Sequence, residues 1–146
     1  AEAIHAASRG ERITVVFVNN AVYGMTGGQM APTTLPGQDT TTSPGGRDVR
    51  SAGHPIKVCE LLSTLEGPAY IARVSVTRPA NVARAKQALR KAFQAQIKDM
   101  GFSLVEFLSS CPTNWKMSPI EALRWIDDEM SRFYPLGEYK VAPGLN

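Results

Sequence analysis

The chain has 146 residues, of which 43% are hydrophobic and 20% are charged, and its formal net charge is +3. These values predict one globular domain with its own core and exclude a largely disordered chain. Basic residues do not alternate with aromatic ones and no apolar run could span a bilayer, so neither nucleic acid nor a membrane is an expected partner.

The first part of the chain predicts a short helix, a strand and a polar turn. Residues 2–9 form the helix, which Gly10 ends. Because no capping residue precedes this helix, we interpret the chain as a fragment whose start lies upstream. Residues 12–18 are nearly all apolar, which is typical of a parallel strand covered on both faces. This strand ends abruptly at the amides Asn19 and Asn20, and a glycine-rich turn follows them.

A change of composition marks residues 31–55, which are rich in Thr, Pro, Gly and Ser. A loop this long inside a compact domain is usually functional or disordered. Within it, Arg47 is predicted either to pair with Asp48 or to bind a carboxylate or phosphate. His5 and His54 have no partner at metal or catalytic spacing, and we interpret both as structural or solvated.

The remainder of the chain alternates helices with strands. Helices are predicted over residues 56–65, from Pro79 to Met100 and from Ser118 onward, and strands over residues 69–76 and 102–108. The last helix has the clearest start, because Ser118 and Glu121 form a capping box. The tail from Pro135 has no period and is expected to wrap a surface. This alternation predicts right-handed βαβ crossovers, and therefore an α/β fold with a parallel sheet flanked by helices.

The long helix that starts at Pro79 has two predicted faces. Its apolar period predicts a buried stripe of Val82, Ala85, Leu89, Ala92, Phe93 and Met100. Its basic residues, Arg84, Lys86, Arg90 and Lys91, are interpreted as a solvated face.

In such a fold, the loops that follow strands lie at one edge of the sheet, where ligands bind. We therefore expect the turns at Asn20, after Val76 and at Cys111 to share that edge. An asparagine side-chain oxygen is a hard ligand suited to Mg²⁺, and glycines allow backbone N–H groups to approach a phosphate. The turn at Asn20 is thus a candidate metal-diphosphate site, although two asparagines after a strand also form an ordinary turn.

Several segments together resemble one enzyme family. They are VNNAVYGMTGGQ at residues 18–29, APTT at 31–34, LEGPAYI at 65–71, CPTNW at 111–115, EAL at 121–123 and YPLG at 134–137. The segments resemble the β subunit of 2-oxoacid:ferredoxin oxidoreductases, which use thiamine diphosphate. By this resemblance, residues 1–146 are the C-terminal part of a thiamine diphosphate-binding domain that is incomplete at its N-terminal side. Residues 31–55 are then its active-site loop.

The resemblance implies a cofactor role for the turn. Asn20 would bind Mg²⁺ through its side chain and Val22 through its backbone oxygen. The remaining candidate cofactor-binding residues are Tyr23, Gly24, Met25, Thr26 and Gly27. The family's Gly-Asp-Gly motif, which supplies the first metal ligand, is absent from the chain. We therefore expect this chain alone to bind Mg²⁺-thiamine diphosphate weakly and to be inactive. No catalytic residue is assigned, because in this family the activating glutamate comes from a partner α subunit.

Cys111 has two interpretations. A lone cysteine before a proline is more often structural than a ligand, but the resemblance implies that Cys111 holds a [4Fe–4S] cluster in the complete protein. Such a cluster normally needs four thiolates. Cys59 lies in an apolar helical stripe and is predicted to belong to the core.

The activity implied by the resemblance is oxidative decarboxylation of a 2-oxoacid with coenzyme A. The products are an acyl-CoA, CO₂ and electrons for ferredoxin, and the partners are an α subunit, with γ and δ subunits as further candidates. Met25 stands where pyruvate-type relatives have a polar residue, which favours 2-oxoglutarate or a branched-chain acid. One alternative is another thiamine diphosphate enzyme, which would share the Asn-Asn turn without the segment at Cys111. The other alternative is a non-catalytic fragment or structural subunit. The absence of the metal-binding aspartate and of three cluster cysteines from the chain favours this alternative.

Overall fold

The computed structural model describes residues 1–145, which form two compact units. The sheet unit consists of residues 1–18, residues 58–107 and the segment from Pro135 onward. The turn unit consists of residues 19–57 and 108–134. Each unit has its own hydrophobic core.

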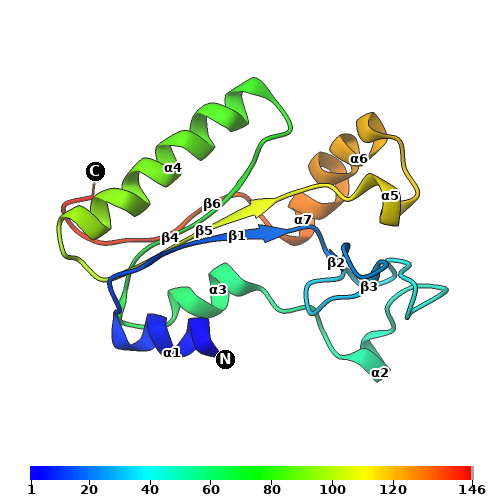
Figure 1. Ribbon diagram of the computed structural model, residues 1–146, viewed down its shortest axis with the longest axis horizontal. Helices are drawn as coiled ribbons and strands as arrows, with labels where there is room; N and C mark the ends of the chain where they lie inside the picture. The colour runs from blue at the N-terminus through cyan, green and yellow to red at the C-terminus, as the bar shows by residue number, and fades with distance from the viewer. Residues whose placement is uncertain (146) are drawn as a thin grey trace. The chain divides into compact units, whose positions relative to one another are not determined.

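The sheet unit is built on a four-stranded sheet with the order β1-β5-β4-β6. Its strands are β1 (Thr14–Asn19), β4 (Pro68–Ser75), β5 (Phe102–Leu108) and β6 (Gly137–Val141). Helix α4 (Pro79–Ile97) covers one face, and α1 (Glu2–Arg9) and α3 (Val58–Ser63) cover the other (Figure 1). The expected helix-flanked α/β architecture is therefore confirmed.

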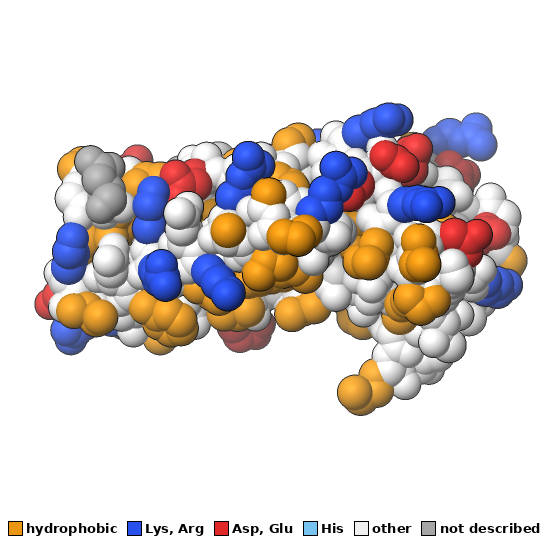
Figure 2. Space-filling model, turned by 90° about the horizontal axis from the view of Figure 1, so that it is seen from above, with side chains coloured by type: hydrophobic (Ala, Val, Ile, Leu, Met, Phe, Trp, Pro, Cys, Tyr) orange, Lys and Arg blue, Asp and Glu red, His pale blue; other side chains and the backbone are white. Residues whose placement is uncertain are grey.

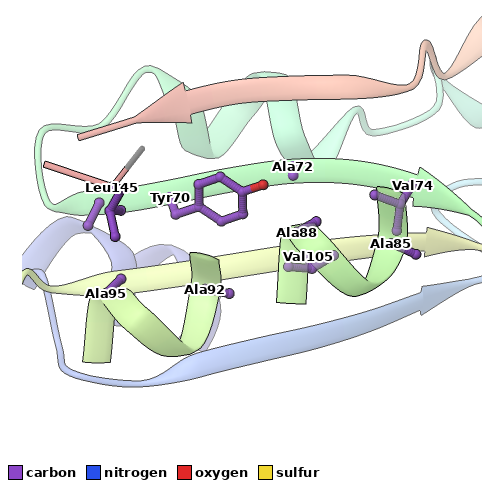
Figure 3. Close-up of a cluster of buried hydrophobic side chains, with 10 residues drawn as sticks. Tyr70, Ala72, Val74, Ala85, Ala88, Ala92, Ala95, Val105 and Leu145 are labelled. Carbon is purple, nitrogen blue, oxygen red and sulfur yellow. The ribbon is translucent and has the colours of Figure 1, made fainter. Parts of the chain in front are cut away.

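Three of the four strands are parallel, as predicted. Ser103 N–H donates to the Ile13 oxygen and Ser109 N–H donates to the Asn19 oxygen, so β1 and β5 advance in the same direction. Strands β1 and β5 point the same way in Figure 1, and the faint ribbons of Figure 3 show β4 pointing with them and β6 pointing the opposite way. The sheet is therefore mixed, with β6 as its antiparallel member.

The tail from Pro135 was expected to wrap a surface because it lacks a period, and this expectation is wrong. Residues 137–141 instead form β6, which pairs with β4 from Tyr70 opposite Val141 to Arg73 opposite Gly137. The backbone groups along the outer side of β4 need hydrogen-bond partners, and β6 supplies them. A five-residue edge strand with one half-solvated face carries little apolar period, which is why the sequence pattern missed it.

Small side chains bring α4 close to the sheet. The buried residues of α4 are Ala85, Ala88, Ala92 and Ala95. They pack on Tyr70, Val74 and Val105 (Figure 3). Phe93 was predicted to be in this core, but 54% of it is exposed. Each residue advances the helix by about 100°, so Phe93 lies to one side of the stripe of four alanines and not over the sheet.

The outer face of α4 carries basic and apolar side chains together, as the view from above shows (Figure 2). Arg84, Lys86 and Arg90 are exposed, and half-buried Lys91 pairs with Glu138 across 3.0 Å. The prediction of a solvated basic face is therefore confirmed for this helix.

Strand β1 lies at the edge of the sheet, and the expectation that both its faces are covered is wrong for the described residues. Val15 and Phe17 pack against the core on the α1 and α3 side. Val16 and Val18, which alternate with them, are 50% and 59% exposed. The apolar composition of β1 predicted two covered faces, but within the described residues only the face that carries Val15 and Phe17 packs against a core.

The turn unit contains a hairpin and a set of short helices. The hairpin pairs β2 (Val22–Tyr23) with β3 (Gln29–Met30). The helical elements are α2 (Val49–Ala52), α5 (Pro112–Trp115), α6 (Pro119–Trp125), the π-helical turn η1 (Ile126–Met130) and α7 (Ser131–Phe133). The predicted capping box at Ser118 and Glu121 is confirmed at the start of α6. Helix α6 continues through η1 and α7, and its apolar side packs on the core around Leu108 and Tyr134.

Arg47 organises the long loop at residues 31–55. Its guanidinium is buried and donates to five backbone carbonyls, those of Ala31, Pro32, Thr34, Ala52 and Gly53. Asp48 instead caps α2 by accepting from Arg50 N–H. Neither expected role of Arg47 is observed, because backbone carbonyls from both ends of the loop converge on it.

Among residues 1–145, no helix combines the length and the apolar character that crossing a bilayer requires.

Candidate functional site

The candidate site lies within the turn unit, where the residues that follow β1 meet the residues that follow β5. Trp115 Nε1 donates to the Asn20 backbone oxygen at 3.1 Å. Asn114 Nδ2 donates to the Gly24 backbone oxygen at 3.0 Å. The prediction that the turns at Asn20 and Cys111 share one edge is therefore confirmed. The turn after Val76 belongs to the sheet unit, and its place at this edge stays a prediction.

Two asparagines redirect the chain at the end of β1. The Asn19 side-chain oxygen accepts from Ala21 N–H at 3.1 Å, and the Asn20 side-chain oxygen accepts from Val22 N–H at 3.4 Å. Ala21, which directly follows the two asparagines, adopts the left-handed conformation, with φ of 57°. The Ala21 oxygen accepts from the buried Thr34 hydroxyl at 2.6 Å, which ties the turn to the long loop. The Asn20 side chain is thus held by one local hydrogen bond, which it accepts from Val22 N–H.

Residues 23–28, which we name the cofactor turn, form a tight loop between β2 and β3. Gly28 N–H donates to the Tyr23 oxygen at 2.9 Å and closes the loop. Gly27 and Gly28 have φ of 117° and 82°, which favour glycine. The Thr26 hydroxyl donates to the Gln29 side-chain oxygen at 2.7 Å, and the Gln29 side-chain nitrogen donates to the Thr26 backbone oxygen at 2.8 Å. The loop is therefore held by backbone and side-chain bonds at both of its ends.

Gly24 lies between the predicted metal ligand and the predicted cluster ligand. A Cβ added at Gly24 would lie 3.4 Å from Asn20 Nδ2 and 3.0 Å from Cys111 Sγ. A glycine is therefore needed where the two segments approach each other. The structure thus brings Asn20, the cofactor turn and Cys111 into one small neighbourhood, as the sequence predicted.

Helix α5 clamps the cofactor turn from one side. The Asn114 amide nitrogen donates both to the Gly24 oxygen and to Cys111 Sγ, the second at 3.1 Å. The Trp115 ring packs on Trp125 with centroids 4.6 Å apart, which fixes its indole nitrogen against Asn20. No role was predicted for Asn114 or Trp115, although both belong to the CPTNW segment at residues 111–115.

The opposite side of the cofactor turn is open. Met25 is fully exposed, Tyr23 is 53% exposed, and Thr26 and Gly27 are exposed as well. Val22, by contrast, is buried beneath the turn. The cofactor turn thus leaves Met25, Thr26 and Gly27 accessible to a ligand, while α5 supports the turn through Asn114.

The donor set of this neighbourhood fits a hard cation and a phosphate, but only in part. The Asn20 side-chain oxygen accepts one long hydrogen bond, and an amide oxygen has a second lone pair for a metal ion. Over the described part of the chain, no group of three or more His, Cys, Asp or Glu residues could hold a metal ion. The oxygens offered by Asn20 and Val22 are neutral, so a carboxylate from elsewhere is needed for tight Mg²⁺ binding.

The sequence and the fold both have known relatives. Residues 1–107 match the family described as thiamine pyrophosphate enzyme, C-terminal TPP binding domain. The ketoisovalerate oxidoreductase subunit VorA of Methanothermobacter marburgensis is 50% identical over 139 residues, which are 95% of this chain and 29% of that subunit. The 2-oxoglutarate synthase subunit KorB of Archaeoglobus fulgidus is 36% identical over 129 residues, which are 88% of this chain and 44% of that subunit. The chain thus spans less than half the length of these two relatives.

A solved structure shares the fold. It is a 2-oxoglutarate:ferredoxin oxidoreductase from Magnetococcus marinus with 2-oxoglutarate, coenzyme A and succinyl-CoA bound. The TM-score is 0.68 at 24% identity, and the match covers 99% of this chain and 53% of that chain. The expected thiamine diphosphate-binding fold is therefore confirmed, with a mixed sheet in place of a wholly parallel one.

Proposed function

The chain belongs to the thiamine pyrophosphate enzyme family, of which it carries the C-terminal TPP-binding domain, and we propose that it is part of a 2-oxoacid:ferredoxin oxidoreductase. The observation that carries this proposal is the meeting of Asn20, Gly24 and Cys111, because a metal-diphosphate turn and an iron–sulfur ligand belong together in a redox enzyme of this kind. The relatives named as ketoisovalerate and 2-oxoglutarate enzymes support it. In the proposed reaction, a 2-oxoacid and coenzyme A give an acyl-CoA, CO₂, a proton and two electrons, which pass to ferredoxin.

The cofactor turn has the binding role in this proposal. Asn20 would hold Mg²⁺ by its side-chain oxygen and Val22 by its backbone oxygen. Tyr23, Gly24, Met25, Thr26 and Gly27 would face the diphosphate or the substrate. When bound, thiamine diphosphate supplies the electron sink that lets a 2-oxoacid lose CO₂. The residues of this chain orient the cofactor, and the missing carboxylate comes from another part of the complete protein.

Cys111 is the proposed cluster ligand of this chain. It is half-buried, and its sulfur accepts a hydrogen bond from Asn114. Cys59 is a poor second ligand, because it is fully buried in the core of the sheet unit and its thiol donates to Glu106 at 3.1 Å. Burial raises the pKa of the Cys59 thiol, as does the nearby Glu106 carboxylate, so this cysteine stays protonated. The other thiolates of a [4Fe–4S] cluster come from elsewhere in the complete protein.

The proposed substrate is a branched-chain 2-oxoacid, with 2-oxoglutarate as the second candidate. Met25, an apolar side chain, stands fully exposed at the tip of the cofactor turn. An apolar contact at this point favours a substrate with an apolar side chain. The relative that is 50% identical is named for ketoisovalerate, which agrees with this choice. The proposed partners are an α subunit, with γ and δ subunits as further candidates, and ferredoxin.

The test is turnover by the complete enzyme, purified with all its subunits, on ketoisovalerate, 2-oxoglutarate and pyruvate. Ferredoxin reduction and acyl-CoA formation are measured in parallel, each with and without coenzyme A. We expect the highest kcat/KM on ketoisovalerate. A preference for pyruvate would contradict the substrate assignment. Product formation without ferredoxin reduction would indicate another thiamine diphosphate enzyme, and no turnover on any acid would indicate a structural subunit.

A further inference from the structure

We propose that Asn114 is a positioning residue that aims the backbone N–H of Met25 at an anionic oxygen of the bound ligand. This inference rests on the proposed function of the cofactor turn. It assigns a task to a side chain that belongs to another segment of the chain and to which the family resemblance gives no role.

The amide of Asn114 fits against both ends of the cofactor turn. Its nitrogen donates to the Gly24 oxygen at 3.0 Å. On the other side, a Cβ added at Gly28 would lie 2.7 Å from the Asn114 side-chain oxygen, so the amide touches Gly28 with no room to spare. The same nitrogen donates to Cys111 Sγ at 3.1 Å, which fixes the rotation of the amide group. Asn114 is therefore held in one orientation. It gives the Gly24 oxygen its shorter hydrogen bond, since the other donor to this oxygen, Gly27 N–H, lies 3.4 Å away.

The position of the Gly24 oxygen determines the direction of the Met25 N–H. Gly24 C=O and Met25 N–H belong to one planar peptide group, and the chain has no cis peptide bond over the described residues. In a trans peptide the C=O and N–H bonds point in opposite directions. Because Asn114 draws the Gly24 oxygen toward α5, the Met25 N–H points away from α5.

The side away from α5 is the open side of the turn. Met25 is fully exposed there, and Thr26 and Gly27 are exposed beside it. A backbone N–H that faces this side is a donor for an anion, as in other glycine-rich loops that bind phosphate. The anionic oxygen belongs either to the diphosphate of the cofactor or to the carboxylate of the 2-oxoacid, and the experiment distinguishes these sources.

The experiment uses the complete enzyme and two substitutions at Asn114. Asn114→Leu removes both donated hydrogen bonds at similar volume. Asn114→Asp keeps the shape of the side chain but replaces the donor with an acceptor that faces the Gly24 oxygen. This second variant tests the same bond if the leucine variant does not fold. The matched control is Gln96→Leu, because the Gln96 amide also donates hydrogen bonds to backbone oxygens, those of Ile13 and Gly101, but in the sheet unit, where β1 and β5 begin.

Three quantities are measured for each variant: the Kd of Mg²⁺-thiamine diphosphate by calorimetry, the KM for ketoisovalerate and kcat at saturating ligands. A hydrogen bond contributes about 1 kcal/mol, so we expect either the cofactor Kd or the substrate KM to rise about fivefold to tenfold in both Asn114 variants. The value that rises identifies the source of the anionic oxygen. At saturation, kcat should change less than twofold, and Gln96→Leu should leave all three values near those of the wild type.

Unchanged Kd and KM in both Asn114 variants would overturn the inference, as would losses no larger than those of Gln96→Leu. A fall in kcat alone would also overturn it, because an aimed N–H acts on binding. If the wild-type complete enzyme binds no thiamine diphosphate, the proposed function fails and the inference fails with it. That outcome is visible in the wild type before any variant is made, so the two failures are distinguishable.

Discussion

Trp115 donates a hydrogen bond from its indole N–H to the backbone oxygen of Asn20, a residue 95 positions earlier in the chain. This bond connects the helix after β5 to the residue that is the proposed Mg²⁺ ligand. Because the Asn20 oxygen is held from outside, the orientation of the Asn20 side chain depends on packing in α5 and α6 as well as on its own turn. The site is therefore assembled by tertiary contacts, and its parts can be tested separately.

The substitution Trp115→Phe should weaken the site while it preserves most of the packing. It removes the bond to Asn20, so we expect the free energy of unfolding to fall by about 1 kcal/mol and the affinity for Mg²⁺-thiamine diphosphate to fall in the complete enzyme. Chemical denaturation and calorimetry measure the two effects. The control is Trp125→Phe, which changes the same ring contact but leaves the bond to Asn20 in place. Equal losses of cofactor affinity in the two variants would show that the hydrogen bond is not what matters.

The substitution Gly28→Ala should destabilise the chain for two separable reasons. Gly28 has φ of 82°, which is unfavourable for alanine, and the new Cβ would lie 2.7 Å from the Asn114 side-chain oxygen. Gly37→Ala is a matched control, because Gly37 has φ of 73° and nothing within 4 Å of an added Cβ. We expect a loss of about 1 kcal/mol for Gly37→Ala from backbone strain alone, and about 1–3 kcal/mol more for Gly28→Ala from overpacking. Similar unfolding free energies for both variants would show that Asn114 moves aside without cost.

Local signals in the sequence were enough to predict most helices and strands. Gly10 ends α1 in the left-handed conformation, and Ser118 with Glu121 begins α6, because both signals act within one turn of helix. The meeting of the Asn20 and Cys111 turns also followed from the sequence, because parallel strands end at the same edge of a sheet.

Features that depend on distant partners could not be predicted. The role of Arg47 required five carbonyls from residues 31–53 to converge, and no pattern near Arg47 encodes that. Strand β6 forms because β4 has an unpaired edge, not because of its own apolar period. The clamp by Asn114 and Trp115 depends on the distance between two turns, which only the folded chain determines.

The buried ion pair between Arg73 and Glu106 should be a major determinant of stability in the sheet unit. Both side chains are fully buried, and Arg73 Nε lies 2.8 Å from a Glu106 carboxylate oxygen. Glu106→Gln removes the charge that faces a buried guanidinium, so we expect the free energy of unfolding to fall by about 3 kcal/mol. The control is Asp99→Asn, which breaks an exposed pair with Arg12 and should cost less than about 1 kcal/mol. A loss as small as that of the control would mean that Glu60, which also pairs with Arg73, is sufficient.

The two cysteines should differ completely in cluster binding. We expect Cys111→Ser to lower the iron content and to abolish or alter the electron paramagnetic resonance signal of the reduced cluster in the complete enzyme. Cys59→Ser should leave both unchanged, because Cys59 is buried, protonated and bonded to Glu106. Iron and acid-labile sulfide are measured per enzyme molecule after anaerobic purification. Wild-type iron content in Cys111→Ser would remove Cys111 from the ligand set and leave the thiamine diphosphate site untouched.

The proposed Mg²⁺ site lacks a carboxylate ligand among the described residues. Asn20 and Val22 offer only neutral oxygens, and the part of the chain described by the structure holds no cluster of acidic residues that could complete the coordination of a metal ion. The chain by itself should therefore bind Mg²⁺-thiamine diphosphate weakly, whereas the complete enzyme should bind it tightly and lose affinity on Asn20→Ala. Calorimetry on both proteins, with and without Mg²⁺, measures the difference. Binding by the chain alone as tight as that of the complete enzyme would show that no external carboxylate is needed.

Because Asn20→Ala also removes the long bond to Val22 N–H, the control is Asn19→Ala, which disrupts the adjacent turn without removing a proposed metal ligand. A larger loss of Mg²⁺-dependent binding in Asn20→Ala than in Asn19→Ala would assign the metal contact to Asn20.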